Sequence, residues 1–190
     1  MHIERPVEDG TGPGGSRGVA PRRRKTLFVL AVAALGAMAG IAVQWAIRDP
    51  AVIQPETEFI GVMGEKFSMT SLRGKVLLVN FWATTCAVCV EEMPQIVRTY
   101  EKFRDRPFDT VAVAMSYDPP NRVAAFAQNN KLPFRVALDT FGKAAAAFSG
   151  IRGTPTTFLV GKDGQVVRKF EGAPDFGQLH LLIEKELAKG

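Results

Sequence analysis

The stretch NFWATTCAVCVEEMP (80–94) decides how this chain folds. It continues the apolar run VLLVNF (76–81), which predicts a strand buried on both faces. A short turn then leads into a predicted helix over 87–104, interrupted near Pro94. Because the helix begins near Cys86, the sulfur of that residue should face unpaired backbone N–H groups and the positive end of the helix dipole. These surroundings favour a thiolate, so we expect the pKa of Cys86 to lie below the ~8.5 of a free cysteine.

A second cysteine, Cys89, follows three residues after Cys86, within one helical turn, so the two sulfurs can reach each other. The spacing suits thiol–disulfide exchange. In that reaction the outer sulfur, Cys86, attacks a substrate disulfide and the buried one, Cys89, resolves the mixed disulfide.

Three other uses of the cysteine pair remain open. Half of a metal site would need further ligands, but the only histidines, His2 and His180, fall in the N-terminal tail and the last predicted helix. A purely structural disulfide closing so short a loop would constrain little of the unfolded chain. A peroxidase typically has Pro and Thr or Ser at fixed positions before its cysteine, where this chain has Val79 and Ala83.

The segment GTPTTF (153–158) lies at the start of another predicted strand. A proline there suits a special turn, such as a cis Thr154–Pro155 bond, although an ordinary trans turn proline is the alternative. If this turn lies beside the cysteines, it would expose the backbone groups of Thr154 for pairing with an extended substrate segment.

Elsewhere the C-terminal part alternates strands with helices and ends in a hairpin and a helix. This order predicts an α/β fold in which helices flank a mixed central sheet. The expected elements are a hairpin at 58–69, strands at 110–116 and 134–138, helices at 119–130 and 141–148, hairpin strands at 156–160 and 165–170, and a helix at 175–188.

The N-terminal part has a different character. Residues 1–25 are rich in Gly, Pro and Arg, which predicts a disordered cytoplasmic tail, and 26–47 form a 22-residue stretch without a charge. As a helix this stretch would be about 33 Å long, enough for one transmembrane anchor. The basic cluster at 22–25 should stay in the cytoplasm, so a linker at 48–57 and a domain at 58–190 should lie outside the membrane. Cleavage as a signal peptide is the alternative.

The charge distribution argues against nucleic-acid binding. The net charge is +5, but residues 1–48 carry seven basic and three acidic groups, whereas 49–190 carry 17 and 16. A nucleic-acid-binding domain would need basic residues spread over a folded face. The basic excess instead fits the orientation of a membrane segment.

Three segments of the chain resemble the membrane-anchored thiol:disulfide oxidoreductases of the TlpA/ResA/CcmG type, within the thioredoxin superfamily. They are GKVLLVNFWATTCAVCVEEMP (74–94), GTPTTFLVGKDGQVV (153–167) and the predicted helix and strand at 119–138, which resemble an insertion of this branch. The resemblance covers roughly 57–189. It implies a thioredoxin-like fold with one N-terminal transmembrane helix, and a redox-active disulfide with no other cofactor.

The resemblance also implies roles for individual residues. Cys86 matches the attacking cysteine, Cys89 the resolving cysteine, and Glu92 an active-site glutamate that moves protons to and from them. Asn80 stands where thioredoxin has a buried aspartate, which leaves Glu92 as the candidate for proton transfer. The alternative for Glu92 is an ordinary solvated carboxylate on a helix.

For substrate binding, Pro155 matches the cis-proline of the family and Trp82 the tryptophan that packs beneath the active site. We predict that Thr154, Pro155 and Trp82 bind the substrate. Thr156 stands where cytochrome-maturation members often have glutamate, which weakens an assignment to cytochrome c biogenesis.

Together these features predict a single-pass protein of the cytoplasmic (inner) membrane whose catalytic domain faces the periplasm. We expect it to reduce disulfides in exported proteins and to be recharged by a membrane electron donor of the CcdA/DsbD kind. A disulfide oxidase or isomerase is the alternative within enzymes. A copper(I)-binding metallochaperone is the alternative outside them, because copper(I) prefers soft thiolate ligands.

Overall fold

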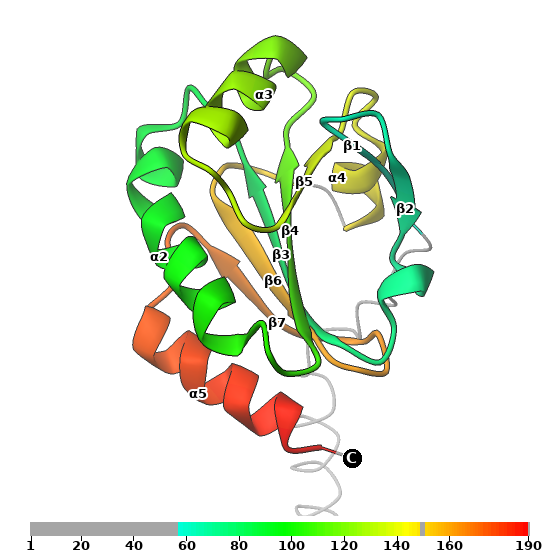
Figure 1. Cartoon of the computed structure of the whole chain (residues 1–190), viewed down its shortest axis with the longest axis vertical. Helices are drawn as coiled ribbons and strands as arrows, with labels where there is room; N and C mark the ends of the chain where they lie inside the picture. Colours follow the sequence, from blue (N-terminus) through cyan, green and yellow to red (C-terminus); the bar gives the residue numbers. More distant parts are fainter. Residues whose placement is uncertain (1–56, 149–150, 190) are drawn as a thin grey trace, which may run out of the picture. The chain divides into compact units, whose positions relative to one another are not determined.

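The computed structural model describes residues 57–148 and 151–189 (Figure 1). The predicted tail at 1–25, the anchor at 26–47 and the linker up to residue 56 lie outside these described residues. Among the helices of the described ranges, none has the length and apolar character needed to cross a bilayer.

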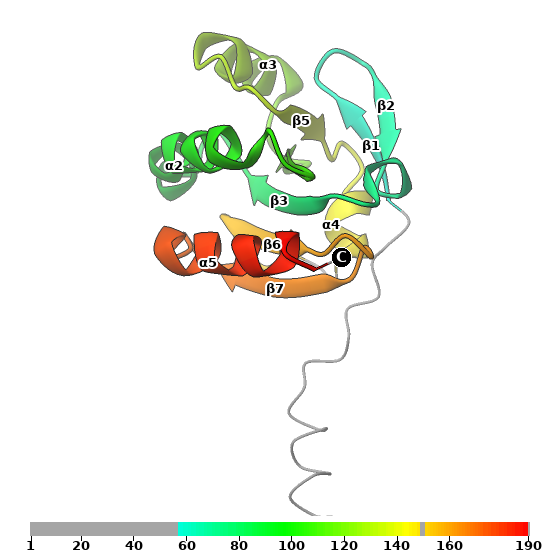
Figure 2. The same ribbon diagram turned by 60° about the horizontal axis from the view of Figure 1, so that its bottom comes forward.

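A seven-stranded mixed sheet forms the centre of the domain, in the order β2-β1-β5-β4-β3-β6-β7. The three neighbours β3, β4 and β5 are parallel, whereas the other pairs are antiparallel. Figure 2 shows β1 and β2 at one end of the sheet and β7 at the other. The strands are β1 (Glu58–Gly61), β2 (Lys66–Ser68), β3 (Val76–Trp82), β4 (Phe108–Ala114), β5 (Arg135–Leu138), β6 (Thr156–Val160) and β7 (Val166–Glu171).

Helices cover both faces of this sheet, as the sequence predicts. Side chains of α2, α3 and α5 pack into one core cluster, and side chains of α4 and the short η1 pack into the cluster on the opposite face. Figure 1 shows where these helices lie around the sheet. The helices are η1 (Thr70–Leu72), α2 (Ala87–Phe103), α3 (Pro120–Asn129), α4 (Lys143–Ala147) and α5 (Phe176–Leu187).

The central strand β3 contributes to both clusters because successive side chains of a strand point to opposite faces. Leu78 and Trp82 join the cluster beneath α2, whereas Leu77 and Phe81 join the other, and all four are almost completely buried. Each such side chain stabilises the fold by roughly 1.5–3 kcal/mol. The same alternation puts the polar Asn80 on the face covered by α2.

Two differences from the sequence predictions concern the helix α2 and the strand β4. The helix over Ala87–Phe103 continues through Pro94 without the expected interruption. A proline removes one N–H donor, but its φ is compatible with a helix, and the buried Met93 and Ile96 on either side hold the helix against the sheet.

Strand β4 is the second difference, because it begins at Phe108, two residues before the predicted start. The charged Asp109 resembles a loop residue in the sequence, but it is buried within the strand. Its carboxylate pairs with Lys75 at 3.2 Å and also with Arg135, and these two cations compensate the buried charge.

The topology brings three loops to one edge of the sheet. Because β3 and β4 are parallel, with Trp82 opposite Ala114, both strands end at that edge. Because β6 is antiparallel to β3, with Thr156 opposite Phe81, β6 begins there. The loops after β3, after β4 and before β6 therefore meet, although they lie far apart in the sequence.

Candidate active site

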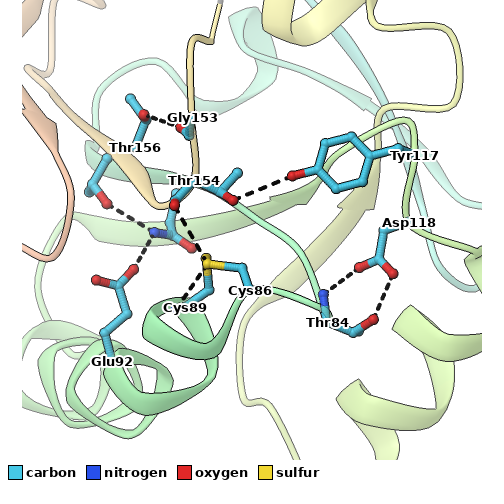
Figure 3. Close-up of a disulfide and its surroundings, with 11 residues drawn as sticks. Thr84, Cys86, Cys89, Glu92, Tyr117, Asp118, Gly153, Thr154 and Thr156 are labelled. Atoms are coloured by element: carbon cyan, nitrogen blue, oxygen red, sulfur yellow. Dashed lines mark hydrogen bonds between the residues drawn. A yellow bond between two sulfur atoms is a disulfide. The ribbon is translucent and has the colours of Figure 1, made fainter.

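A disulfide between Cys86 and Cys89 lies in the first turn of α2, with the two Cα atoms 5.2 Å apart. Cys86 is the N-cap of the helix and has an extended backbone conformation. The backbone N–H of Cys89 donates a hydrogen bond to the Sγ of Cys86 over 3.2 Å (Figure 3). The predicted arrangement of a cysteine sulfur facing the N–H groups of a helix start is therefore confirmed.

The two sulfurs differ in accessibility. Cys86 is half-buried, whereas Cys89 is 0% exposed. Val88, which lies between them in the sequence, is exposed. Another protein approaching this edge of the sheet would therefore reach the sulfur of Cys86 first.

The loop before β6 lies against the disulfide, which meets the condition for pairing a substrate segment with Thr154. The carbonyl oxygen of Thr154 is 3.5 Å from the Sγ of Cys86. The Thr154–Pro155 peptide bond is cis, so the alternative of a trans turn proline does not apply. Pro155 is buried and Thr154 half-buried. The hydroxyl group of Thr156 closes the turn by donating to the carbonyl oxygen of Gly153 over 2.7 Å.

A buried carboxyl group, that of Glu92, lies one helical turn after Cys89 and is 4% exposed. The Nδ2 of Asn80 donates to Glu92 Oε1 over 2.9 Å and to the Oγ1 of Thr157 over 2.9 Å. Among the described residues, the Oε2 of Glu92 has no hydrogen-bond partner. Burial raises the pKa of Glu92 to about 7, and the hydrogen bond from Asn80 opposes part of that shift.

This environment contradicts the alternative of a solvated helix carboxylate. A carboxyl group with a pKa of about 7 is present in both its protonated and its ionised form at neutral pH, unlike an ordinary glutamate. Glu92 is thus able to act as a proton donor or acceptor on the same helix as both cysteines.

Trp82 requires a correction to the predicted site. Its side chain is 0% exposed, and it packs against Phe126 of α3 with a ring-centroid distance of 5.0 Å. It belongs to the same core cluster as Cys89. Trp82 is therefore a core residue, and a docked substrate would not touch it, contrary to its prediction as a substrate-binding residue.

The loop between β4 and α3 contributes residues that the sequence analysis missed. Asp118 accepts hydrogen bonds from the backbone N–H of Thr84 over 2.5 Å and from its Oγ1 over 2.6 Å. The hydroxyl groups of Tyr117 and Thr154 are 3.4 Å apart (Figure 3). The available signal was the YDPP segment (117–120), which directly follows the strand predicted at 110–116.

Paired sulfurs of unequal accessibility at the start of a helix, beside a cis-proline loop, can exchange disulfide bonds with another molecule. The fold and the site thus define a thioredoxin-like thiol:disulfide oxidoreductase. Within residues 57–148 and 151–189, no group of three or more His, Cys, Asp or Glu side chains is arranged to hold a metal ion.

Comparisons with known proteins identify the family. The Redoxin family model matches residues 50–179. The thiol-disulfide oxidoreductase ResA of Bacillus cereus is 33% identical over 122 residues, which cover 64% of this chain and 69% of the relative. The ResA of Bacillus subtilis is 30% identical over 117 residues, covering 62% of this chain and 64% of that protein.

A solved structure agrees with this result. The thiol:disulfide interchange protein of the thioredoxin family from Chlorobium tepidum is 26% identical, with a TM-score of 0.66, over 73% of this chain and 98% of that one. The chain belongs to the Redoxin family, and it is a thiol:disulfide oxidoreductase of the TlpA/ResA/CcmG type.

Proposed function

We propose that this protein reduces disulfide bonds in exported proteins, with Cys86 as the nucleophile and Cys89 as the resolving thiol. The observation that carries the proposal is the position of Cys86 as a half-buried N-cap whose sulfur accepts the N–H of Cys89. That hydrogen bond and the helix dipole stabilise negative charge on the sulfur that a substrate reaches first.

The reaction proceeds in two exchanges that conserve thiols and disulfides. The thiolate of Cys86 attacks one sulfur of the substrate disulfide, which forms a mixed disulfide and releases the other substrate sulfur as a thiolate. Cys89 then loses its proton and attacks the Sγ of Cys86. The second substrate thiolate leaves, the Cys86–Cys89 disulfide forms, and two electrons have passed from the protein to the substrate.

We assign the proton transfer of the second exchange to Glu92. Cys89 is completely buried, so its proton needs an acceptor within the protein, and Glu92 lies one turn further along the same helix. With a pKa of about 7, the carboxylate accepts a proton at neutral pH and later releases it.

For substrate binding, we assign the main contact to the backbone of Thr154, next to Pro155. Its carbonyl oxygen lies 3.5 Å from the sulfur of Cys86, so an extended substrate segment paired there would hold its disulfide close to the nucleophile. The exposed side chains of Val88 and Tyr117 offer apolar surface near this position.

The site of action follows from the N-terminal sequence. The uncharged stretch at 26–47 and the basic cluster at 22–25 support a single transmembrane anchor with residues 58–190 outside the cytoplasmic membrane. A membrane electron donor of the CcdA/DsbD kind would restore the dithiol after each turnover. A reporter fused after Gly190 should be active only outside the cytoplasm, and activity inside it would contradict this topology.

Trapping substrates tests the assigned roles. A Cys89→Ser variant should accumulate covalent complexes with disulfide-bearing proteins, because the mixed disulfide on Cys86 can no longer be resolved. These complexes should disappear on addition of a reducing agent and be missing from a matched Cys86→Ser/Cys89→Ser variant. Complexes that persist in the double variant, or that do not form in the single one, would refute the assignment.

The reduction potential tests the direction of the reaction. A value near −270 mV, as in thioredoxin, is expected for a reductase, whereas a value near −120 mV, as in DsbA, would identify an oxidase instead.

A further inference from the structure

Asp118 is a buried carboxylate that neither the exchange reaction nor the family assignment uses. It lies between β4 and α3 and is only 4% exposed. Both of its oxygens accept hydrogen bonds from one residue, Thr84: Oδ2 from the backbone N–H and Oδ1 from the side-chain hydroxyl (Figure 3). Among the described residues, Asp118 forms no ion pair. Burying a carboxylate is costly, and these two charge-assisted hydrogen bonds from Thr84 offset part of the cost.

The residue that Asp118 holds lies two positions before Cys86. Between them the chain makes a tight turn, in which the N–H of Cys86 donates to the carbonyl oxygen of Ala83 over 3.1 Å. A displacement of Thr84 would therefore move the backbone of Cys86, because the turn leaves little room for compensation.

Asp118 is itself fixed relative to the sheet. Its N–H donates to the carbonyl oxygen of Met115 over 2.9 Å, and the N–H of Met115 donates to the carbonyl oxygen of Trp82 over 3.0 Å. The loop after β4 is thus hydrogen-bonded both to the end of β3, at Trp82, and to the loop after it, at Thr84. The start of α2 is positioned by this connection as well as by the helix packing.

We propose that Asp118 is a positioning residue, which acts through Thr84 to hold the sulfur of Cys86 against the N–H of Cys89 and so sets the reactivity of the reduced thiol. This inference rests on the proposed role of Cys86 as the nucleophile. Without Asp118, the turn at 83–86 would be free to relax. The hydrogen bond from the N–H of Cys89 to the sulfur of Cys86 would then weaken, and the thiolate would be less stabilised.

The chain offers a matched control in Asp139. This carboxylate is 5% exposed, and its two oxygens also accept two hydrogen bonds, from the N–H groups of Ala144 and Ala145 at 2.9 Å each. It differs in what it holds, because its donors begin α4 rather than the cysteine loop. Asp139→Ala therefore also removes a buried carboxylate that accepts two hydrogen bonds, but it leaves the contact between Asp118 and Thr84 in place.

The experiment uses the full chain with Cys89→Ser, so that Cys86 is the only thiol. The rate of its alkylation by iodoacetamide is measured against pH in this parent, in Asp118→Ala and in Asp139→Ala. With Asp118→Ala we expect the profile to shift by about one pH unit upward and the rate at pH 7 to fall roughly three- to tenfold. With Asp139→Ala we expect the parent profile. Equal profiles in all three proteins, or equal shifts in both alanine variants, would overturn the proposal.

Two further variants keep the test decisive. In Asp118→Asn the amide can still accept from the Thr84 N–H and donate to its hydroxyl group, so the rate should stay within about twofold of the parent. A loss as large as in Asp118→Ala would assign the effect to the charge and overturn the positioning role. Should Asp118→Ala not fold, Thr84→Ala removes one of the two hydrogen bonds and should shift the profile upward by a smaller amount. An unchanged profile would again overturn the proposal.

This test is independent of the protein substrate, because iodoacetamide needs no docking surface. Failure of the parent dithiol protein to reduce protein disulfides would refute the proposed function and leave the alkylation result standing. Normal disulfide reduction with unchanged alkylation in Asp118→Ala would refute only the positioning role.

Discussion

Helices α2 and α5 begin with the same capping geometry but with different atoms. In α5 the carboxylate of Asp175 accepts the N–H of Gln178 over 2.9 Å, and in α2 the sulfur of Cys86 accepts the N–H of Cys89 over 3.2 Å. Both capping residues have an extended backbone, and each is followed by a helix of at least three turns. Capping stabilises a helix end in either case.

The difference lies in what surrounds each cap. Asp175 is exposed, and its described hydrogen bonds, from the N–H of Gln178 to the carboxylate and from the N–H of Leu179 to the backbone carbonyl, both come from its own helix. Cys86 is half-buried, bonded to a second sulfur and 3.5 Å from the carbonyl oxygen of Thr154. An ordinary helix start therefore becomes a reactive site when sulfur replaces oxygen in the cap and neighbouring loops enclose it.

The largest effect is expected from replacing the sulfur of the α2 cap by oxygen. In Cys86→Ser the hydroxyl group still caps the helix, so the stability should stay within about 1 kcal/mol of the reduced wild type. Disulfide reduction should fall by at least about a thousandfold, because a hydroxyl group is not ionised near neutral pH and forms no disulfide. Turnover assays and denaturant unfolding measure the two quantities, and retained turnover would reject Cys86 as the nucleophile.

A smaller effect is expected from Glu92, the buried carboxyl group in the second turn of α2; the buried carboxylate of α5, Glu186, lies instead near the C-terminal end of its helix. The folded-state pKa of Glu92, about 7, lies above its ordinary value of 4.5, so the native state binds this proton more tightly than the unfolded chain does. The stability from this preference is complete below pH about 4.5 and is lost as the pH rises through about 7.

Glu92→Gln isolates this contribution. Relative to the variant, the wild type should lose on the order of 3 kcal/mol of unfolding free energy between pH 4.5 and 8. The wild-type rate of resolution should also show an inflection near pH 7 that the variant lacks. If the wild type and Glu92→Gln have parallel curves of stability against pH and superimposable profiles of rate against pH, Glu92 neither holds a proton near pH 7 nor transfers one.

The smallest effect is expected at the α5 cap. Asp175→Ala removes the hydrogen bond to Gln178 and should cost about 1 kcal/mol of unfolding free energy. The alkylation rate of Cys86 should be unchanged, because this cap has no described contact with the disulfide. A change in that rate would mean that the two helix starts are coupled.

Sequence patterns predict much of this architecture. The buried strand before Cys86, the hairpin that turns at Asp163 and Gly164, and the position of Cys86 at a helix start all follow from hydrophobic period and turn chemistry. The expected break at Pro94 is wrong, because packing of the apolar face of α2 outweighs one lost hydrogen bond.

Contacts between residues far apart in the chain were harder to predict from the sequence. Glu92 was identified from the family resemblance, but its burial and its hydrogen bond to Asn80 depend on how α2 packs against β3. The contact between Asp118 and Thr84 depends on the parallel pairing of β3 with β4, which hydrophobic period does not specify. Trp82 is apolar and near the cysteines in sequence, yet the alternation along β3 turns it into the core.

The central claim is that the helix start ionises the sulfur of Cys86. Thiolate absorbance in the reduced full chain, followed against pH with Cys86→Ser as the reference, measures this ionisation directly. We predict that Cys86 is half ionised clearly below pH ~8.5, the value for a free cysteine. Half-ionisation at or above that pH, with both sulfurs unreactive near neutrality, would contradict the account.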